Sequence, residues 1–249
     1  MLRTSCFIVV MLVALTWPAR AQQASGSCVA CHVRGAAPMP DAHRGEPWST
    51  SAHATVGCQT CHGGDATAMH PSVAHRGVRD AVSPFSTINP ANLSRTCAMC
   101  HSTIANAYRN TIHQVLLDAG DSRVPTCMTC HGAGVTVRPT PADAERMCAA
   151  CHGPHSARAA YPAAMRTRIE TTHVLQTRAD ALERSFQYLD DATRDSVAGV
   201  LGDARGLIAA SLAAMHGGDP TTVDEQHAAA KTRLDTVDAR LSAIIRNYR

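Results

Sequence analysis

The feature that most constrains this chain is the pattern C-x-x-C-H, which occurs five times and uses ten of the eleven cysteines. The copies are Cys28-Cys31-His32, Cys58-Cys61-His62, Cys97-Cys100-His101, Cys127-Cys130-His131 and Cys148-Cys151-His152. The eleventh cysteine, Cys6, lies in an apolar stretch at the N-terminus. Every cysteine after that stretch therefore belongs to a copy of the pattern.

The pattern has a chemical meaning. Two thiols at this spacing can each add to a vinyl group of one haem, and the following histidine then binds the iron as the proximal ligand. A disulfide framework does not require a histidine after every second cysteine, and zinc sites do not use five pairs with this spacing. The sequence therefore predicts five covalently attached haem c groups.

The second axial ligands are to be sought among the nine histidines outside the motifs. Nine is a surplus for five irons, which favours bis-histidine coordination and electron transfer over open catalytic haems. The candidates for distal ligands are His53, His70, His75, His113, His155 and His173.

Two of these candidates occupy similar places in a larger repeat. His53 precedes the second motif and His113 precedes the fourth, and thirty residues separate the first cysteines of motifs one and two and of motifs three and four. This repeat favours a duplicated two-haem unit with a distal histidine in each connector. His155 follows the fifth motif too closely to bind its own iron, so we expect it to serve a neighbouring haem.

The long connector after the second motif contains two further candidates, His70 and His75, one of which we expect to be a ligand. His43 is a weaker alternative. His173 is on a predicted helix, on the side opposite an apolar stripe with heptad spacing. The stripe consists of Leu175, Ala179, Leu182, Phe186 and Leu189.

The other two histidines of the C-terminal region are expected to have structural roles. His216 resembles an ordinary histidine at a helix C-terminus, and His227 lies on an apolar stripe. That second stripe contains Ala230, Leu234, Val237, Leu241 and Ile244.

The N-terminus is typical of an export signal. An apolar run of twelve residues, from Cys6 to Trp17, precedes Ala19 and Ala21 in the A-x-A arrangement of a cleavage site. The run is short for a membrane span, which takes about 20 residues. We therefore expect residues 1–21 to be removed, leaving a periplasmic protein without a membrane span; an uncleaved anchor is the alternative.

The remaining chain divides by composition. Residues 22–158 are expected to form a compact pentahaem cytochrome c domain with extensive loops, because about 26 residues per haem between Cys28 and His155 leave room for little core besides the porphyrins. Residues 159–249 are expected to form an antiparallel helical hairpin or bundle, with a change of phase near Thr193. The fold class is thus mainly α. The heptad stripes predict a seam either within one chain or between chains of a homo-oligomer.

Charge excludes one class of partner. The formal net charge is only +3, with no polybasic segment, so nucleic acid is not expected to bind. We expect redox proteins as partners instead.

The connectors carry a resemblance. Trp48-x-x-Ser-x-His53 before the second motif, Asn89-Pro-Ala-Asn-Leu93 before the third and Pro125-Thr before the fourth resemble the multihaem cytochromes related to hydroxylamine oxidoreductase, its tetrahaem electron acceptor and cytochrome c nitrite reductase. The resemblance covers roughly residues 28–155. It implies bis-histidine haems, a periplasmic location and partners in nitrogen-oxide or respiratory redox chemistry.

A departure from the enzymes of this group favours an electron carrier. Nitrite reductases of this group usually have lysine in the motif of the catalytic haem, whereas all five motifs here end in histidine and the single lysine is Lys231. No catalytic residue is assigned. The alternative is a reductase or oxidoreductase that acts on a small nitrogen oxide, hydroxylamine or peroxide at one haem with an open coordination position.

Overall fold

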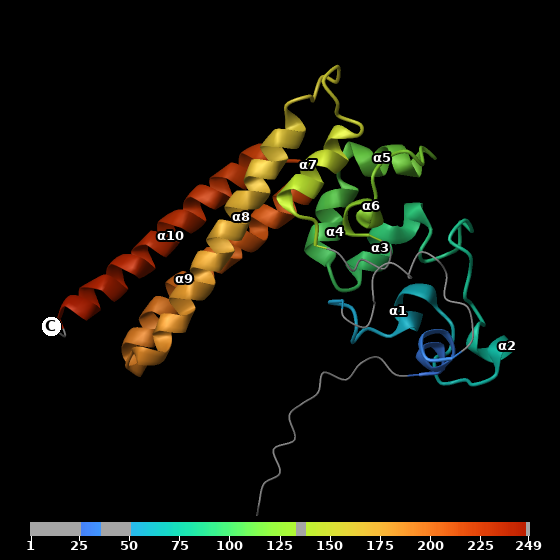
Figure 1. Cartoon of the computed structure of the whole chain (residues 1–249), viewed down its shortest axis with the longest axis horizontal. Helices are drawn as coiled ribbons and strands as arrows, with labels where there is room; N and C mark the ends of the chain where they lie inside the picture. The colour runs from blue at the N-terminus through green and yellow to red at the C-terminus, as the bar shows by residue number, and fades with distance from the viewer. Residues whose placement is uncertain (1–25, 36–50, 133–137, 248–249) are drawn as a thin grey trace, which may run out of the picture.

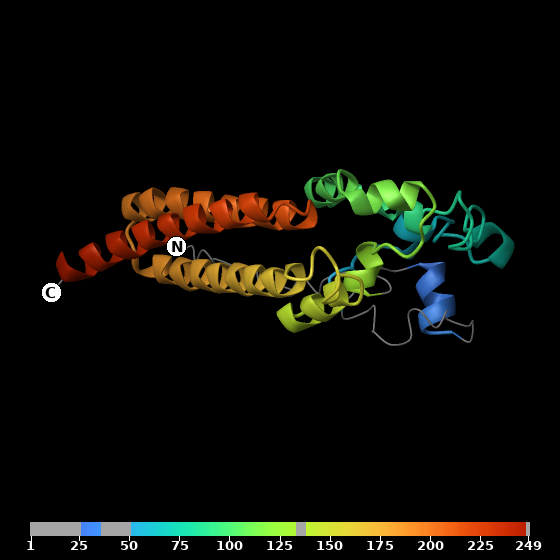
Figure 2. The same ribbon diagram turned by 90° about the horizontal axis from the view of Figure 1, so that it is seen from above.

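The structure is a computed structural model that describes residues 26–35, 51–132 and 138–247. Within these ranges it is built of helices, turns and loops without a strand, so the predicted mainly α fold is confirmed. The chain forms two parts that lie end to end, one with the five motifs and one with three long helices (Figure 1, Figure 2). The predicted signal segment and His43 lie outside the described residues.

Short helices build the part that carries the motifs. They are η1 (Val29–Val33), α1 (Cys58–His62), α2 (Pro71–Ala74), η4 (Pro90–Asn92), α3 (Leu93–Ala98), α4 (Ser102–Arg109), α5 (Ile112–Asp118), α6 (Cys127–His131) and α7 (Pro141–Ala149). The large cluster of buried hydrophobic residues lies wholly in the other part of the molecule. The motif part thus has little apolar core of its own among the described residues, as expected if a bulky cofactor supplies it.

Two of these helices coincide with a motif. Helices α1 and α6 each begin at the first motif cysteine and end at the motif histidine. The next residues, Gly63 and Gly132, both have φ of 74°. Only glycine adopts this left-handed conformation without steric cost, so the backbone can turn away directly after the histidine.

The C-terminal part is an antiparallel bundle of three long helices. These are α8 (Tyr161–Arg184), extended by the short η5 (Ser185–Tyr188), α9 (Asp191–His216) and α10 (Pro220–Asn247). Helix α9 begins where Asp190 Oδ1 accepts a hydrogen bond from the Thr193 backbone N–H at 2.9 Å. The predicted change of phase near Thr193 is therefore a boundary between two helices.

The heptad stripes form the core of the bundle. The buried cluster comprises Leu175, Ala179, Leu182, Phe186, Val197, Leu201, Ala204, Ile208, Ala230, Leu234, Val237 and Leu241, with Leu189 packed against it. Both predicted stripes contribute to this cluster, together with residues of α9. The seam predicted within or between chains thus lies within one chain.

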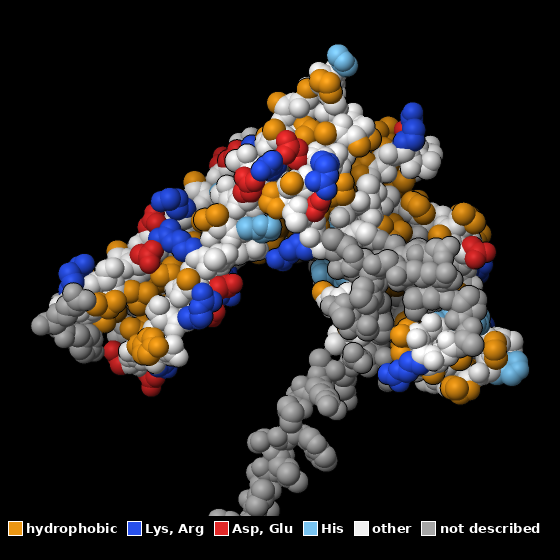
Figure 3. All heavy atoms as spheres, in the orientation of Figure 1, with side chains coloured by type: hydrophobic (Ala, Val, Ile, Leu, Met, Phe, Trp, Pro, Cys, Tyr) orange, Lys and Arg blue, Asp and Glu red, His pale blue; other side chains and the backbone are white. Residues whose placement is uncertain are grey.

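Ion pairs lie along the outside of the bundle. Arg178 of α8 pairs with Asp235 of α10 at 2.7 Å and with Asp238, and Arg168 pairs with Asp224 at 2.7 Å. Figure 3 shows cationic and anionic side chains alternating along this face. Because exposed pairs contribute at most about 1 kcal/mol each, they fix the registry of α8 and α10 more than they stabilise the bundle.

One helix of the described residues, α9, is long and apolar enough to cross a membrane by length and composition, a property that the sequence analysis overlooked. Several of its apolar side chains, including Val197, Leu201 and Ile208, are buried in the bundle core. Packing within the bundle accounts for this part of its composition.

Candidate haem sites

Hydrogen bonds to backbone carbonyls join the first three motifs in sequence order. The Ser27 N–H, just before the first motif, donates to the Ala66 carbonyl after the second motif at 2.8 Å. The Thr87 hydroxyl donates to the Cys61 carbonyl in the second motif, and the Thr96 hydroxyl, next to the third motif, donates to the Thr87 carbonyl at 2.6 Å. The loop between motifs two and three therefore bonds to both.

The third and fourth motifs touch through their cysteines. The Cys97 thiol bonds to the Cys127 sulfur, and this hydrogen bond raises the pKa of Cys97 and lowers that of Cys127 to about 7. The Tyr108 hydroxyl of α4 donates to the Pro125 carbonyl at 2.6 Å, which holds the approach to the fourth motif against the third. Burial raises the pKa of Cys61, and the nearby Cys97 thiol raises it further.

The same proximity holds at both ends of the motif series. Burial raises the pKa of the Cys58 thiol, and the Cys28 thiol of the first motif adds to this rise. Burial likewise raises the pKa of Cys130, with a further contribution from Cys148 of the fifth motif. Each motif thus lies near the next one along the chain.

The ten motif cysteines are all free thiols, so none is used in a disulfide. In the described part of the chain, no three histidine, cysteine or acidic side chains gather closely enough to hold a metal ion by themselves.

Four motif histidines each face a histidine from outside the motifs. The ring centroids are 5.8 Å apart for His32 and His75, 6.1 Å for His101 and His53, 6.2 Å for His152 and His113, and 6.2 Å for His131 and His216. The remaining motif histidine, His62, is half-buried at the end of α1.

The spacing within these pairs fits two ligands on one metal ion. A metal–imidazole nitrogen bond is about 2 Å long, and the ring centroid lies roughly 1.1 Å beyond the nitrogen. Two imidazoles on opposite sides of one iron therefore have centroids about 6.3 Å apart. A single contact at this distance is also common for aromatic rings, but here the same pairing recurs at four motifs.

The hydrogen bonding of His75 also suits a ligand. Its Nδ1 lies 2.9 Å from the Pro71 carbonyl oxygen, which can only accept. Nδ1 is therefore protonated, and the lone pair of the neutral ring is on Nε2. Metal-bound histidines are typically oriented in this way.

The structure separates the predicted distal histidines into two groups. His53, His75 and His113 face motif histidines. His70 is exposed with its Nδ1 2.9 Å from the Ser72 hydroxyl, and His155 is also exposed. His173 is half-buried on α8; within the described ranges, the structure pairs none of these last three rings with a motif histidine.

Two residues at these sites escaped the sequence reasoning. His216 faces His131 although 85 residues separate them, and no local pattern distinguishes it from other helix-terminal histidines. The Tyr161 ring lies 6.0 Å from that of His152, and burial raises the pKa of its hydroxyl. The surplus of histidines was the only signal that could have pointed to His216.

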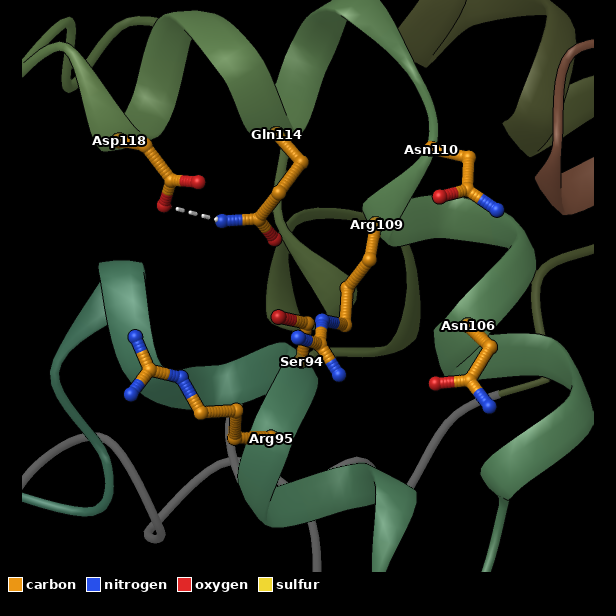
Figure 4. A pocket seen from close by; sticks show the side chains of 7 residues that line it. All are labelled: Ser94, Arg95, Asn106, Arg109, Asn110, Gln114 and Asp118. Carbon is orange, nitrogen blue, oxygen red and sulfur yellow. Dashed lines mark hydrogen bonds between the residues drawn. The ribbon is translucent and has the colours of Figure 1, made fainter.

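A polar pocket of about 370 Å³ adjoins the third motif (Figure 4). It is lined by Ser94, Arg95, Asn106, Arg109, Asn110, Gln114 and Asp118. Gln114 is only 5% exposed; its Nε2 donates to Asp118 at 2.7 Å, whereas its Oε1 has no partner among the described residues. An unpaired buried acceptor is costly, so the pocket suits a polar occupant such as water. Its two arginines would suit a carboxylate, such as a carboxylate group of haem.

Comparison with known proteins gives one match. A family model described as cytochrome c554 and c-prime matches residues 13–63, which include the first two motifs. No curated protein and no solved structure matches the chain significantly. The chain is thus similar over this segment to the cytochrome c554 and c-prime family, which supports a multihaem c-type cytochrome with covalently bound haem c and a role in electron transfer.

Proposed function

We propose that the chain is an exported pentahaem c-type cytochrome that transfers electrons between redox partner proteins in the periplasm. The ten motif cysteines would form the thioethers, and the five motif histidines would bind the irons. On the resemblance of its connectors, we place it with the multihaem cytochromes related to hydroxylamine oxidoreductase and cytochrome c nitrite reductase.

The observation that carries this proposal is the pairing of predicted distal histidines with motif histidines. His53, His75 and His113 each come from a connector or short helix and face a motif ring at 5.8 to 6.2 Å. An iron with a histidine on both sides has no open position for a substrate. The pairs therefore favour a carrier over an enzyme at these sites.

The residues present fit haem c in several respects. Unpaired thiols, paired imidazoles and a motif part with little apolar core all suit it. When bound, haem c supplies one-electron oxidation and reduction. The chain itself anchors the group through cysteines and orients its ligands, as the Pro71 carbonyl does for His75.

The order of the motifs in space supports transfer along the chain. Consecutive motifs lie near each other from the first to the fifth, through the contacts of Ser27, Thr87 and Tyr108 and the neighbouring thiols. Groups held by these motifs would follow one another in the same order. Such a series suits the acceptance of electrons at one end and their release at the other.

The proposal is tested by counting haems and determining their spin state. We expect the purified holoprotein to give five haems per chain by the pyridine haemochrome assay, and only low-spin signals by electron paramagnetic resonance. A variant with Cys148→Ala and Cys151→Ala should lose one haem and serves as the internal standard. Fewer than five haems in the unaltered protein would contradict the pentahaem assignment.

The same spectra test the enzyme alternative. One high-spin haem per chain would reveal an open iron and favour a reductase of nitrogen oxides, hydroxylamine or peroxide. Fractionation of the cells tests the location, because the proposal requires the haem-containing protein in the periplasmic fraction.

A further inference from the structure

His216 occupies the last position of α9, at the end of the bundle that adjoins the motifs. We propose that His216 is the second axial ligand of the iron held by His131, so that an iron bond fastens the bundle to the haem-binding part. This inference rests on the proposed function, since it requires haem at the fourth motif. The bundle of α8, α9 and α10 would then contribute a metal ligand as well as a packed core.

The first observation is the geometry of the two rings. Their centroids are 6.2 Å apart, as in the pairs of His53 and His113, and their planes are inclined by only 7°. The distance matches two imidazoles that share one iron, and it is too long for rings stacked in direct contact. The angle is compatible with ligation because each ring can rotate about the iron–nitrogen axis.

The second observation is the hydrogen bond that orients His216. Its Nδ1 lies 2.7 Å from the Leu212 carbonyl oxygen one turn earlier in α9. This oxygen can only accept, so Nδ1 carries the proton and Nε2 keeps its lone pair. The His75 ring makes the same contact with the Pro71 carbonyl oxygen. Hydrogen bonds from the nitrogen that does not bind the metal set the tautomer and orientation of metal-binding histidines.

The third observation is that α4 contacts both the end of α9, which carries His216, and the segment that leads to His131. At the end of α9, a Cβ added to Gly217 would lie only 3.6 Å from the Ala107 Cβ of α4. The next residue of α4, Tyr108, donates to the Pro125 carbonyl just before the fourth motif. Neighbouring residues of one helix thus position the segment that leads to His131 and the helix that carries His216.

The other two bundle histidines are placed differently. His227 is buried and its Nε2 lies 2.9 Å from the Thr172 hydroxyl, inside the bundle. His173 lies along α8 beside Val174 and Arg178, at a shallow apolar surface. The structure therefore distinguishes His216 from the other two histidines of the bundle. His173 can serve as a control.

The inclination of the rings gives this site its own spectral signature. The planes are inclined by 85° for His32 and His75, 81° for His53 and His101, and 47° for His113 and His152. Parallel imidazoles split the two iron d orbitals of π symmetry in the same sense and give a rhombic low-spin signal. Perpendicular imidazoles cancel this splitting and give a strongly anisotropic signal. Among these four pairs, we expect the rhombic signal from His131 and His216.

The test uses the full-length holoprotein with His216→Ala, and His173→Ala as the matched control. We expect His216→Ala to keep its haem count, to lose the rhombic signal and to gain one high-spin haem. Added imidazole should restore a low-spin signal, which a general loss of folding would not permit. The control should keep the spectrum of the unaltered protein.

A second variant covers the case in which the alanine variant does not accumulate. His216→Met retains an iron ligand of different chemistry, so one low-spin haem should change its absorption and its midpoint potential while the others keep theirs. An unchanged spectrum in either His216 variant, or loss of the rhombic signal in His173→Ala, would overturn the ligand assignment. Absence of haem from the unaltered protein would instead refute the proposed function.

Discussion

At the scale of single residues, the environment of a histidine decides its role more than its place in the sequence does. His70 and His75 flank the same short helix, α2, and the sequence alone left the choice between them open. In the fold, the His75 ring reaches His32, whereas the His70 ring bonds to the Ser72 hydroxyl at the surface. Both rings are exposed, so what separates the two histidines is that only His75 faces a motif histidine.

This contrast leads to a paired test. We expect His75→Ala to produce one high-spin haem at an unchanged haem count, because the iron held by His32 loses its second ligand. His70→Ala should leave all spin states as they are. Electron paramagnetic resonance of the two holoproteins, recorded side by side, makes the comparison. High-spin character in the His70 variant alone would reverse the assignment.

His227 shows a different use of the same side chain. The Thr172 hydroxyl donates to the Arg168 carbonyl at 2.9 Å and therefore accepts from the His227 Nε2–H. Burial lowers the pKa of His227; Arg168 also lowers it, while Asp224 raises it. The folded bundle thus favours the neutral ring.

The sign of the resulting pH dependence follows from this lowered pKa. A histidine with an ordinary pKa of about 6.5 in the unfolded chain binds a proton more readily there than in the bundle. Its contribution to stability is complete above about pH 6.5 and is lost as the pH falls below it. We expect the melting temperature of the unaltered protein to fall more between about pH 7.5 and 5.5 than that of His227→Leu. Equal decreases would argue against this role.

At the scale of elements, the bundle is stabilised mainly by burial of its heptad positions. Leu234 of α10 has no exposed surface and lies in the cluster that joins α8, α9 and α10. The ion pairs on the outside, such as that of Arg178 with Asp235, are more than a quarter exposed on both sides. Dispersion contacts and apolar burial therefore outweigh the charges in the stability of the bundle.

The difference can be measured on one helix. We expect Leu234→Ala to reduce the free energy of unfolding by about 2 to 5 kcal/mol, since it leaves a cavity among three helices. Ile245→Ala, at a position of α10 that is 58% exposed, should change it by roughly 0.5 kcal/mol or less. Urea titration followed by circular dichroism compares the two. Similar losses would show that the core does not lie where the structure places it.

At the scale of the whole molecule, the sequence predicted those features that depend on neighbouring residues. The five motifs follow from local spacing, and the stripe from Leu175 to Leu189 follows from helical periodicity, which the bundle core confirms. The position of His216 could not be predicted in this way. It depends on the lengths of α8 and α9, the turn between them and the packing of Gly217 against Ala107. No short sequence pattern predicts these features.

The overlooked apolarity of α9 has a related cause. Helix α9 contains Asp191, Arg194, Asp195, Asp203 and Arg205, and many of its apolar residues are small alanines, so it does not resemble a membrane span at first sight. The packing of Val197, Leu201 and Ile208 in the bundle core accounts for part of this apolarity, because 28% of the apolar window of α9 is buried.

The contact between Cys97 and Cys127 has a consequence for the biosynthesis of the protein. In the chain without cofactor, two thiols of different motifs lie within hydrogen-bonding distance, and one of them is largely ready to ionise at neutral pH. In an oxidising compartment, such thiols are prone to join each other, and a cysteine consumed in this way can no longer form a thioether. If haem is attached in the periplasm, as proposed, maturation would have either to keep these thiols reduced or to complete attachment before the third and fourth motifs close on each other.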